Sequence, residues 1–417
     1  MRRLIFPLVC VLGMSAGLLP GAIGAVAAVT PASASTVAAN VNDVSCSAPG
    51  ACTAVGDYVN SSGEFVPLAM RWNGTAWERQ VAPAGGTTAT FLFAVSCPSA
   101  AYCLAVGQNE TPGTLPSPTP FAEQWNGTRW SILPGLPRAS TGFLYGVSCL
   151  SPRSCEVVGD KAAALLAARW NGKSWAMQAV SLPTSGATEG DLSAISCSSV
   201  THCAAVGADG TTDSAYPIVA AWNGKSWTTA TAPLPKGAAN PPEVVLSAVS
   251  CGSASSCTAL GSSTAAGNAT YYSASGSGTR WQNAPVIAPK GATGPALNGI
   301  SCVAGTAAWC MGVGLYSADG KTLALAERWN GWAWSLTAAP ASSTLPATGL
   351  LGVSCRARTT CQAVGGQGAG LPLTFAEGWN GKSWAIEPTP QPPAGIKSRG
   401  TWRPWSGRPS WSPAVSN

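Results

Sequence analysis

Fourteen of the 15 cysteines fall into seven short pairs, and this spacing restricts the fold more than any other feature of the chain. The first cysteine of each pair recurs with a mean period of about 51 residues. Self-similarity at such a period is typical of repeat proteins. We therefore expect seven repeated units, marked by the pairs Cys46 with Cys52, Cys97 with Cys103, Cys149 with Cys155, Cys197 with Cys203, Cys251 with Cys257, Cys302 with Cys310 and Cys355 with Cys361.

Residues 1–34 have the pattern of a secretory signal peptide. Arg2 and Arg3 precede an apolar stretch, and small residues follow it up to the expected cleavage point after Ala34. A retained membrane anchor is the alternative, which the Pro20-Gly21 break in the apolar stretch disfavours. We expect a secreted or cell-surface protein with no membrane span in its mature chain.

The remaining cysteines predict a disulfide framework. Without Cys10, which lies in the leader, their number is even, as in exported proteins with structural disulfides. Zinc binding is the alternative. It fits poorly because structural zinc sites favour closer cysteine spacings, and the chain has a single histidine, His202. We expect each pair to form a disulfide within its own unit.

The net charge of +6 does not come from the repeats. Arg2, Arg3 and four basic residues after position 387 account for the excess of 23 Lys and Arg over 17 Asp and Glu. The repeat region is therefore neutral and lacks the basic surface that nucleic-acid binding requires. We expect no nucleic-acid partner.

Each unit contains three β-like phrases. An apolar run ends in Ser-Cys, as in "LFAVSC", a second run follows the turn, as in "CLAVG", and a third leads into "WNGxxW". Short apolar runs bounded by glycine and turn residues are typical of strands, and Asn-Gly is typical of a hairpin turn. We therefore expect four antiparallel strands in each unit.

The third phrase predicts a tryptophan-bearing hairpin. If Asn330-Gly331 form a two-residue type I′ turn, Trp329 lies opposite Trp332 and Trp334 opposite Glu327. Both repeat tryptophans, Trp329 and Trp334, then share one face. The fifth unit departs from the pattern because Gly276 replaces its first tryptophan, so we expect its outer hairpin to pack least well.

Seven such units predict an all-β fold, a seven-bladed β-propeller of four-stranded antiparallel blades with one short-range disulfide per blade. An open β-solenoid is the alternative, although its repeats are usually shorter. We assign residues 35–387 to the propeller and residues 388–417 to a tail.

The repeat resembles that of kelch and galactose-oxidase-type propellers, through "CQAVGG" at 361–366 and "EQWNGTRWSILPGLP" at 123–137. It also resembles Ser-Cys/Trp-Asn-Gly repeats of secreted actinobacterial proteins. Paired cysteines are not a kelch feature, and the glycine doublet occurs only at Gly365-Gly366. The copper chemistry of galactose oxidase requires two histidine ligands and a Tyr–Cys cross-link, and this chain has one histidine.

No catalytic residue, metal site or cofactor is predicted. Repeat-position side chains are interpreted as structural, namely the arginines Arg71, Arg169 and Arg328 and the acids Glu123, Glu327 and Glu377. Asp209 and Asp213 fit a solvated turn better than a calcium loop. Four acids outside the repeat positions could serve an unrecognised enzyme site: Asp160, Asp191, Asp209 and Glu243.

Aromatic residues that break the repeat are the candidate ligand-binding residues, namely Trp309, Trp332, Tyr271 and Tyr272. Trp309 and Trp332 belong to the same unit and would form a platform for a sugar ring or peptide if both were exposed. The alternative is that Trp309 packs locally in its lengthened turn.

The proline-rich and basic tail is expected to be disordered. Its tryptophans and arginines could contact the anionic cell envelope, and an end without function is the alternative. The residues concerned are Trp402, Arg403, Trp405, Arg408 and Trp411.

The sequence therefore predicts a secreted, monomeric, non-catalytic binding module, with a polysaccharide or cell-envelope component as the partner. An exported hydrolase or lyase and a purely structural surface protein are the alternatives.

Overall fold

The computed structural model describes residues 38–392, with gaps at 87–88, 111–117, 140, 266–267, 306–308, 338–346 and 369–372. The chain divides into two units, Met1–Ala34 and Ser35–Asn417, and every described residue belongs to the second. The signal-peptide prediction therefore lies outside the described residues. No helix that could cross a membrane occurs in the described ranges.

Consecutive sets of four strands form the blades of the second unit. The 28 strands are β1 (Ala39–Ala48), β2 (Ala51–Val59), β3 (Phe65–Trp72), β4 (Trp77–Gln80), β5 (Ala89–Ser99), β6 (Tyr102–Glu110), β7 (Thr119–Trp125), β8 (Trp130–Ile132), β9 (Phe143–Ser151), β10 (Ser154–Lys161), β11 (Ala164–Trp170), β12 (Trp175–Gln178), β13 (Glu189–Ser199), β14 (His202–Thr211), β15 (Ser214–Trp222), β16 (Trp227–Thr231), β17 (Glu243–Ser253), β18 (Ser256–Ala265), β19 (Asn268–Ser277), β20 (Arg280–Asn283), β21 (Thr293–Cys302), β22 (Cys310–Ala318), β23 (Lys321–Trp329), β24 (Trp334–Thr337), β25 (Thr348–Ala357), β26 (Thr360–Gln367), β27 (Leu373–Trp379) and β28 (Trp384–Glu387).

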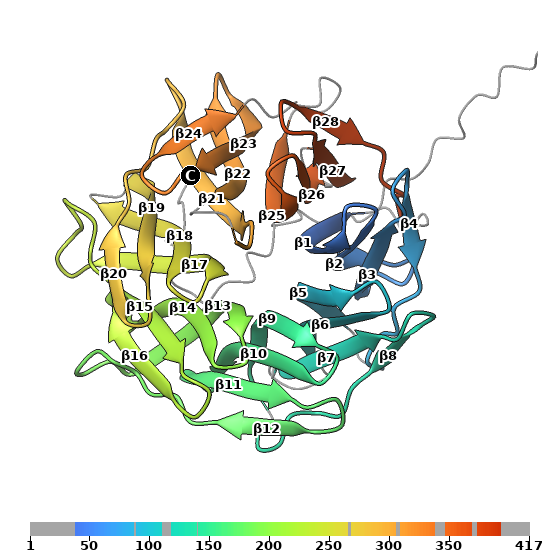
Figure 1. Cartoon of the computed structure of the whole chain (residues 1–417), viewed down its shortest axis with the longest axis horizontal. Coiled ribbons are helices and arrows are strands. Elements are labelled where there is room, and N and C mark those ends of the chain that lie inside the picture. Colours follow the sequence, from blue (N-terminus) through green and yellow to red (C-terminus); the bar gives the residue numbers. More distant parts are fainter. Residues whose placement is uncertain are drawn as a thin grey trace, which may run out of the picture. The chain divides into compact units, whose positions relative to one another are not determined.

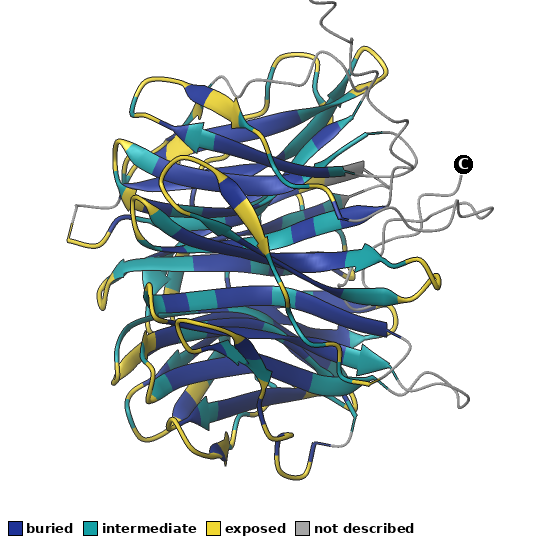
Figure 2. Cartoon of the chain, turned by 90° about the vertical axis from the view of Figure 1, so that its right-hand side faces the viewer, coloured by how far each residue is buried: buried dark blue, intermediate teal, exposed yellow. Residues whose placement is uncertain are grey.

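These strands build a seven-bladed β-propeller, as predicted. Within each blade the strands pair antiparallel in chain order. The blades stand in a ring with the first strand of each blade innermost, and β25 of the last blade lies beside β1 of the first (Figure 1). Buried residues follow the strands, and exposed ones gather mainly at the turns (Figure 2).

All seven predicted disulfides are confirmed, and each joins the first two strands of one blade. The bonded pairs are Cys46 with Cys52, Cys97 with Cys103, Cys149 with Cys155, Cys197 with Cys203, Cys251 with Cys257, Cys302 with Cys310 and Cys355 with Cys361. Their Cα atoms lie 3.9–4.1 Å apart. Such a short distance marks an antiparallel pair whose backbone N–H and C=O groups point away from the partner strand. The N–H of the first cysteine is therefore free to bond outside its own blade.

The second cysteine of each pair is buried and lies opposite the third strand of its blade. In six blades its partner on that strand is the first tryptophan, and in blade 5 it is Gly276. The cross-strand pairs are Cys52 with Trp72, Cys103 with Trp125, Cys155 with Trp170, Cys203 with Trp222, Cys257 with Gly276, Cys310 with Trp329 and Cys361 with Trp379. The disulfide and the tryptophan pair of a blade therefore occupy neighbouring strands at the same level.

The serine before each first cysteine joins the blades through the free N–H of that cysteine in the next blade. Its Oγ accepts a hydrogen bond from this N–H, with N···O distances of 2.9–3.0 Å throughout. The seven bonds run from Cys97 to Ser45, Cys149 to Ser96, Cys197 to Ser148, Cys251 to Ser196, Cys302 to Ser250, Cys355 to Ser301 and Cys46 to Ser354. The last of these bonds closes the ring without any exchange of strands between the end blades.

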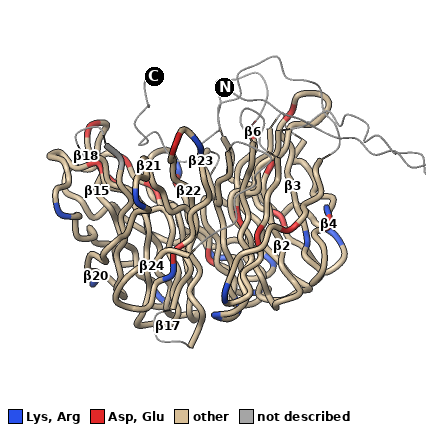
Figure 3. The backbone as a smooth tube through the Cα atoms, turned by 90° about the horizontal axis from the view of Figure 1, so that it is seen from above, with Lys and Arg blue, Asp and Glu red and all other residues tan. Residues whose placement is uncertain are grey.

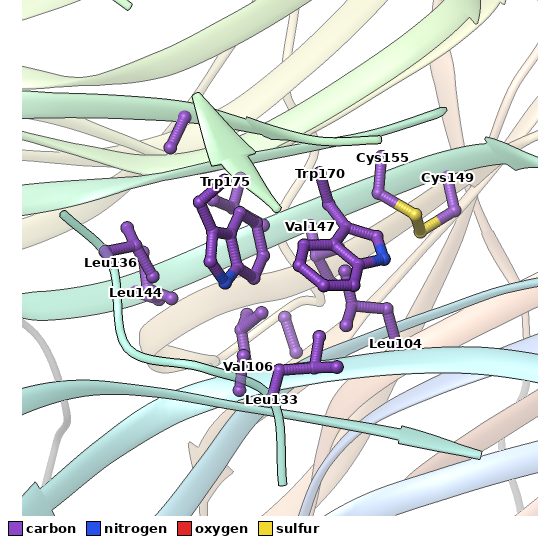
Figure 4. Packing of buried hydrophobic residues seen from close by; sticks show 14 of the residues in the cluster. Leu104, Val106, Leu133, Leu136, Leu144, Val147, Cys149, Cys155, Trp170 and Trp175 are labelled. Atoms are coloured by element: carbon purple, nitrogen blue, oxygen red, sulfur yellow. A yellow bond between two sulfur atoms is a disulfide. The ribbon is translucent and has the colours of Figure 1, made fainter. Parts of the chain in front are cut away.

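The hydrophobic core lies between neighbouring blades. Trp170 and Trp175 of blade 3 lie over Leu104, Val106 and Leu133 of blade 2 (Figure 4). Because the blades are rich in alanine and valine, the tryptophans provide much of the buried apolar area, about 150–250 Å² each.

The tryptophan hairpins confirm one part of the prediction and correct another. Trp329 and Trp334 share a face, with ring centroids 5.5 Å apart, but they lie directly opposite each other. The predicted type I′ turn is wrong because only Gly331 of the Asn-Gly pair has a positive φ, 101°. Instead, Asn330 Oδ1 accepts hydrogen bonds from the N–H groups of Trp332 and Ala333 at 2.9 and 3.0 Å and so shapes a four-residue turn.

The second tryptophan of six blades also ties its blade to the preceding one. Its indole N–H donates to that blade at distances of 2.8–3.3 Å. The bonds run from Trp77 to Glu387, Trp130 to Gln80, Trp175 to the Pro134 carbonyl, Trp227 to Gln178, Trp334 to Ser273 and Trp384 to Thr337.

Candidate functional site

A cavity of about 240 Å³ lies where the first strands of all seven blades converge. Each blade contributes the residues four, three and two positions before its first cysteine. The residue four positions before the cysteine differs between blades and is partly exposed in every one. These seven axial residues are Asn42, Phe93, Tyr145, Ser193, Ser247, Asn298 and Leu351.

A β-bulge presents each axial residue. The register of the first two strands skips this position in every blade. A bulged residue is unpaired and is redirected by the local bend of its strand. The preceding residue is a buried Val or Leu, such as Leu144, which anchors the strand in the core.

Small residues follow the axial position because the blades approach closely there. A Cβ on Gly352 would lie 2.8 Å from the Cα of Asp43, and one on Gly146 would lie 3.0 Å from the Cα of Ala194. Neighbouring first strands therefore leave no room for large side chains at this level. The side chains that line the cavity differ between blades mainly at the bulged axial position.

Asp43 is the exception to the small residues at this level. Its Oδ2 accepts a hydrogen bond from the Val95 N–H of blade 2 at 2.9 Å, and its Oδ1 accepts one from its neighbour Val44 at 2.8 Å. Burial raises the pKa of Asp43 to about 7, although both hydrogen bonds favour the ionised form.

Aromatic rings form one side of the axial cavity. Phe93 and Tyr145 are stacked with ring centroids 6.0 Å apart, and Phe143 stacks on Tyr145 at 5.4 Å. Phe91 continues the stack from Phe93 at 6.3 Å. The apolar ring faces of blades 2 and 3 thus lie beside the amides and hydroxyls of the other axial residues.

Two carboxylates lie around the Tyr145 ring. Its hydroxyl is hydrogen-bonded to Asp160, while Ser193 Oγ donates to Asp191 Oδ2 at 2.6 Å. Burial, together with the negative charges of Asp160 and Asp191, raises the pKa of Tyr145 above its usual value. Burial also raises the pKa of Asp160 to about 6. Tyr145 therefore stays protonated at neutral pH and acts as a hydrogen-bond donor, not as a base.

Charge is separated radially in the described strands, although charged residues are sparse along the backbone (Figure 3). The first two strands of the blades carry nine acidic side chains and two basic ones, Lys161 and Arg356. The outer two strands carry five acidic and six basic side chains. Among the described residues that line the axial cavity, Asp43 is acidic and none is basic, which disfavours an anionic ligand there.

A second cavity, of about 340 Å³, lies on the flank of the ring between blades 5 and 6. Trp281 of blade 5 and Trp329 of blade 6 line it, and it opens where Gly276 replaces the first tryptophan. Trp281 is partly exposed, whereas the second tryptophan of each other blade is buried. The fifth hairpin thus packs less tightly than the others, as the sequence predicts.

The disulfide cysteines have a structural role and supply no free thiol in the described part of the chain. Cys257 alone among them lines one of the two cavities, the one on the flank. The second cysteines of the other blades are buried in the strands and line neither cavity: Cys52, Cys103, Cys155, Cys203, Cys310 and Cys361.

Three of the four predicted ligand-binding aromatics are buried. Trp309 is 7% exposed and packs in the cluster that contains Met311, as in the alternative of local packing, so Trp309 and Trp332 do not form an exposed pair. Tyr271 donates to Glu327 Oε1 at 2.7 Å, and Tyr272 donates to the Pro233 carbonyl.

Trp332 differs from these residues because it is 85% exposed. It directly follows Gly331, which lines the flank cavity. The structure therefore places this predicted residue next to a cavity that arises from another departure from the repeat, Gly276.

The repeat-position acids and arginines do not converge on a site. Glu123, Glu327 and Glu377 are fully buried, and burial raises their pKa values to about 8, 7 and 8. Arg71 donates to the Ala100 carbonyl at 2.8 Å, and Arg169 pairs with a glutamate on the neighbouring strand. These contacts agree with the structural interpretation from the sequence.

The Asp209 carboxylate already has partners. It accepts hydrogen bonds from the Thr184 hydroxyl at 2.7 Å and from the Thr184 N–H at 2.9 Å, which fastens the loop before β13. Asp213 is exposed. No group of three His, Cys, Asp or Glu side chains suited to a metal ion occurs among the described residues.

The tail residues proposed for envelope contact, from Trp402 to Trp411, lie outside the described residues. The structure does describe 388–392. There Thr389 Oγ1 and Gln391 Nε2 donate to the Thr374 carbonyl at 2.8 and 3.3 Å. Residues 389 and 391 therefore contact β27 of the last blade.

Prediction from the sequence missed Phe93, Tyr145 and Asp43. A signal was present, because the position four residues before the first cysteine varies among the blades while its neighbours barely change. The recurring tryptophans drew the prediction to the outer hairpins instead.

Comparisons with known proteins identify the fold and no family. No family model matches the chain, and no curated protein matches it. An ulvan lyase, a polysaccharide lyase solved with a bound saccharide, superposes with a TM-score of 0.54 and 8% sequence identity, covering 85% of this chain and 97% of that one. A xyloglucanase from Xanthomonas campestris superposes with a TM-score of 0.53 and 13% identity, covering 85% of this chain and 55% of that one. Identities this low establish a shared fold alone.

Proposed function

We propose that this protein is an exported, non-catalytic β-propeller that binds glycans through its axial cavity. One observation carries the proposal. The position of the first strand that varies from blade to blade faces a single cavity in all seven blades. Variation confined to one converging position is what a ligand site built on a constant scaffold requires.

The side chains around this cavity suit a sugar ring. Phe93 and Tyr145 line the cavity and are partly exposed, so they offer apolar area to a pyranose. Asn42, Ser193 and Asn298 offer amide and hydroxyl groups for its hydroxyls. The volume is below the roughly 300–1,000 Å³ of drug-sized sites, so the cavity suits a single terminal sugar.

The proposal places the protein outside the cell. Seven disulfides fit an oxidising compartment. Residues 1–34 would direct export, and the tail from Trp402 to Trp411 would contact the anionic envelope. Deleting residues 393–417 and measuring cell-envelope retention tests the role of the tail, and unchanged retention would count against it.

A binding screen of the oxidised protein against polysaccharides and cell-wall fractions tests the proposed function. Phe93→Ala should weaken glycan binding by at least about tenfold, since the loss of one stacked ring removes apolar contact worth roughly 1.4 kcal/mol or more. The control is Ile386→Ala, which removes an exposed apolar side chain from the outer strand β28, outside the lining of the axial cavity. Equal loss in both variants, or no glycan bound at all, would favour a structural role.

A hydrolase or lyase is the second candidate, and one observation favours it. Asp160 and Asp191, two of the acids outside the repeat positions, both lie near Tyr145. Paired carboxyls with one raised pKa are typical of glycoside hydrolysis. Asp160→Asn should abolish any turnover detected in the screen if this candidate is correct, whereas binding without turnover supports the non-catalytic module.

A further inference from the structure

The flank cavity exists because blade 5 has lost the inner member of its tryptophan pair. In the six other blades the two rings pack 5.0–6.0 Å apart, centroid to centroid. Gly276 stands directly opposite Trp281, at the position that holds the first tryptophan in the other blades. The volume that one indole fills elsewhere is therefore open between blades 5 and 6.

The local backbone prevents a side chain from refilling this space. A Cβ on Gly276 would lie 2.2 Å from the Arg280 carbonyl oxygen and 2.7 Å from the Cα of Trp281. The hairpin is tighter than the others because Ser277 pairs with Arg280 across a turn that contains Gly278, whose φ is 56°. The glycine and the tight turn together keep the cavity open.

Trp281 packs against the apolar cluster between blades 4 and 5 but donates no hydrogen bond to blade 4. Its indole N–H donates to the Gly278 carbonyl of its own turn at 3.0 Å. Tyr272 and Asn283 take over the contact with blade 4, donating to the carbonyls of Pro233 and Leu234. Blade 5 thus keeps its attachment to blade 4, and the Trp281 ring is left partly exposed at the cavity.

The lining combines indole rings with hydroxyl groups. Trp281, which is partly exposed, contributes the aromatic surface, and Ser255, Ser256 and Ser275 contribute hydroxyls. Trp329 also borders the cavity but is only 3% exposed. Trp332, 85% exposed, adjoins the cavity through Gly331. The volume of about 340 Å³ falls within the roughly 300–1,000 Å³ of small-molecule sites.

Arg280 gives this cavity a positive charge. None of the described residues that line it is acidic. In the described part of the chain the one ion pair within 4.0 Å joins Arg169 and Glu156, so Arg280 has no carboxylate partner there. The planar guanidinium matches a carboxylate with two parallel hydrogen bonds.

We propose that the flank cavity binds a pyranose ring that bears a carboxylate, a hexuronate, with its C–H face against Trp281 and its carboxylate on Arg280. The serine hydroxyls meet the ring hydroxyls. The site shares no lining residue with the axial cavity, whose acidic lining residue, Asp43, disfavours this anion. Ligand binding at the flank cavity can therefore be tested independently of ligand binding at the axial cavity.

Titration of the full-length oxidised protein with D-glucuronate, D-glucose and benzoate, followed by calorimetry and ligand-observed NMR, tests this assignment. Glucuronate should bind at least about tenfold more tightly than glucose or benzoate, since only glucuronate offers both a carboxylate and a sugar ring. Arg280→Gln should remove this preference. Ser255→Trp, at an exposed turn, should block the cavity.

Arg129→Gln is the matched control. Arg129 precedes the second tryptophan of blade 2, as Arg280 does in blade 5, but beside an intact tryptophan pair. Glucuronate binding should be unchanged in this variant, and also in Phe93→Ala of the axial cavity. Thermal unfolding of each variant checks that the ring remains folded.

Three results would overturn the assignment. They are no glucuronate binding, glucose or benzoate binding as tightly as glucuronate, and equal loss in Arg280→Gln and Arg129→Gln.

Discussion

The Oγ of Ser354 accepts a hydrogen bond from the backbone N–H of Cys46 at 2.9 Å, although 308 residues separate the two in the chain. The equivalent bond occurs between each of the six remaining pairs of neighbouring blades. The Ser-Cys dipeptide therefore has two roles. Its cysteine fastens two strands of one blade, and its serine fastens the next blade around the ring.

Ser354→Ala should destabilise the closure of the ring. The Cys46 N–H loses its acceptor, and an unsatisfied buried donor costs about 1–3 kcal/mol. Hydrogen exchange should accelerate in β1 and β25, and the denaturation midpoint should fall. Ser148→Ala, which removes the same bond between blades 3 and 4, should lower the midpoint similarly without faster exchange in β1 and β25. Equal exchange profiles in the two variants would contradict a local effect on closure.

Stability should decrease from acid to mildly alkaline pH. Burial raises the pKa of Glu123 and of Glu377 from 4.5 to about 8, so the folded state binds more protons than the unfolded state between these values. The contribution of each group is fully present below about pH 4.5 and is lost as the pH rises to about 8. Glu123→Gln should stabilise the protein at pH 8 and flatten its pH profile.

Chemical denaturation at pH 5, 6.5 and 8 measures this dependence. Each group should contribute a decline of up to about 1.4 kcal/mol per pH unit within the window. Exposed Glu243→Gln serves as the control and should leave the slope unchanged. If the free energy of unfolding of the wild-type protein rose towards pH 8 in parallel with that of Glu123→Gln, the raised pKa of Glu123 would be refuted.

Gly276→Ala should destabilise the fifth hairpin. The new methyl group would overlap the Arg280 carbonyl, and overpacking of this kind costs about 1–3 kcal/mol. Gly135→Ala is the control, since a Cβ there meets nothing within 4 Å, and it should change stability by no more than about 0.5 kcal/mol. Unfolding by guanidinium measures both, and equal effects would show that blade 5 adjusts freely.

Trp130→Phe should cost more stability than Trp281→Phe. Trp130 is buried and donates to Gln80 of the preceding blade at 2.9 Å, so its loss removes packing and an interblade bond worth about 1–3 kcal/mol. Trp281 is partly exposed and bonds within its own turn. Thermal denaturation compares the two, and a larger effect at Trp281 would mean that this ring does hold blade 5 in place.

The repeat architecture could be predicted because each phrase carries a local signal. Ser-Cys marks the first strand, and the cysteine spacing fixes each disulfide and its blade. The register of the tryptophan hairpin could not be predicted correctly. Asn-Gly indicates a two-residue turn, but Asn330 Oδ1 accepts two backbone hydrogen bonds and stabilises a four-residue turn instead. The partners of the serines also lie one blade away and leave no local signal.

The candidate site was harder to predict than the fold. Trp309 breaks the repeat and is buried. Its burial could not be predicted, because the sequence does not show whether a ring in a longer turn will face the core or the solvent. Phe93 and Tyr145 stand in apolar strands, where aromatics suggest core. Their common position acquires meaning only once seven first strands converge on one axis.

The joint between the last blade and the first has the same two contacts as five of the six others, a serine–cysteine bond inside and a tryptophan bond, from Trp77 to Glu387, outside. The joint between blades 4 and 5 has the serine–cysteine bond without the tryptophan bond. No strand crosses this joint, and each blade is one uninterrupted stretch of chain. The ring thus has no chemically distinct seam. A circularly permuted chain that begins at any other blade, with its former ends linked, should therefore fold to the same propeller.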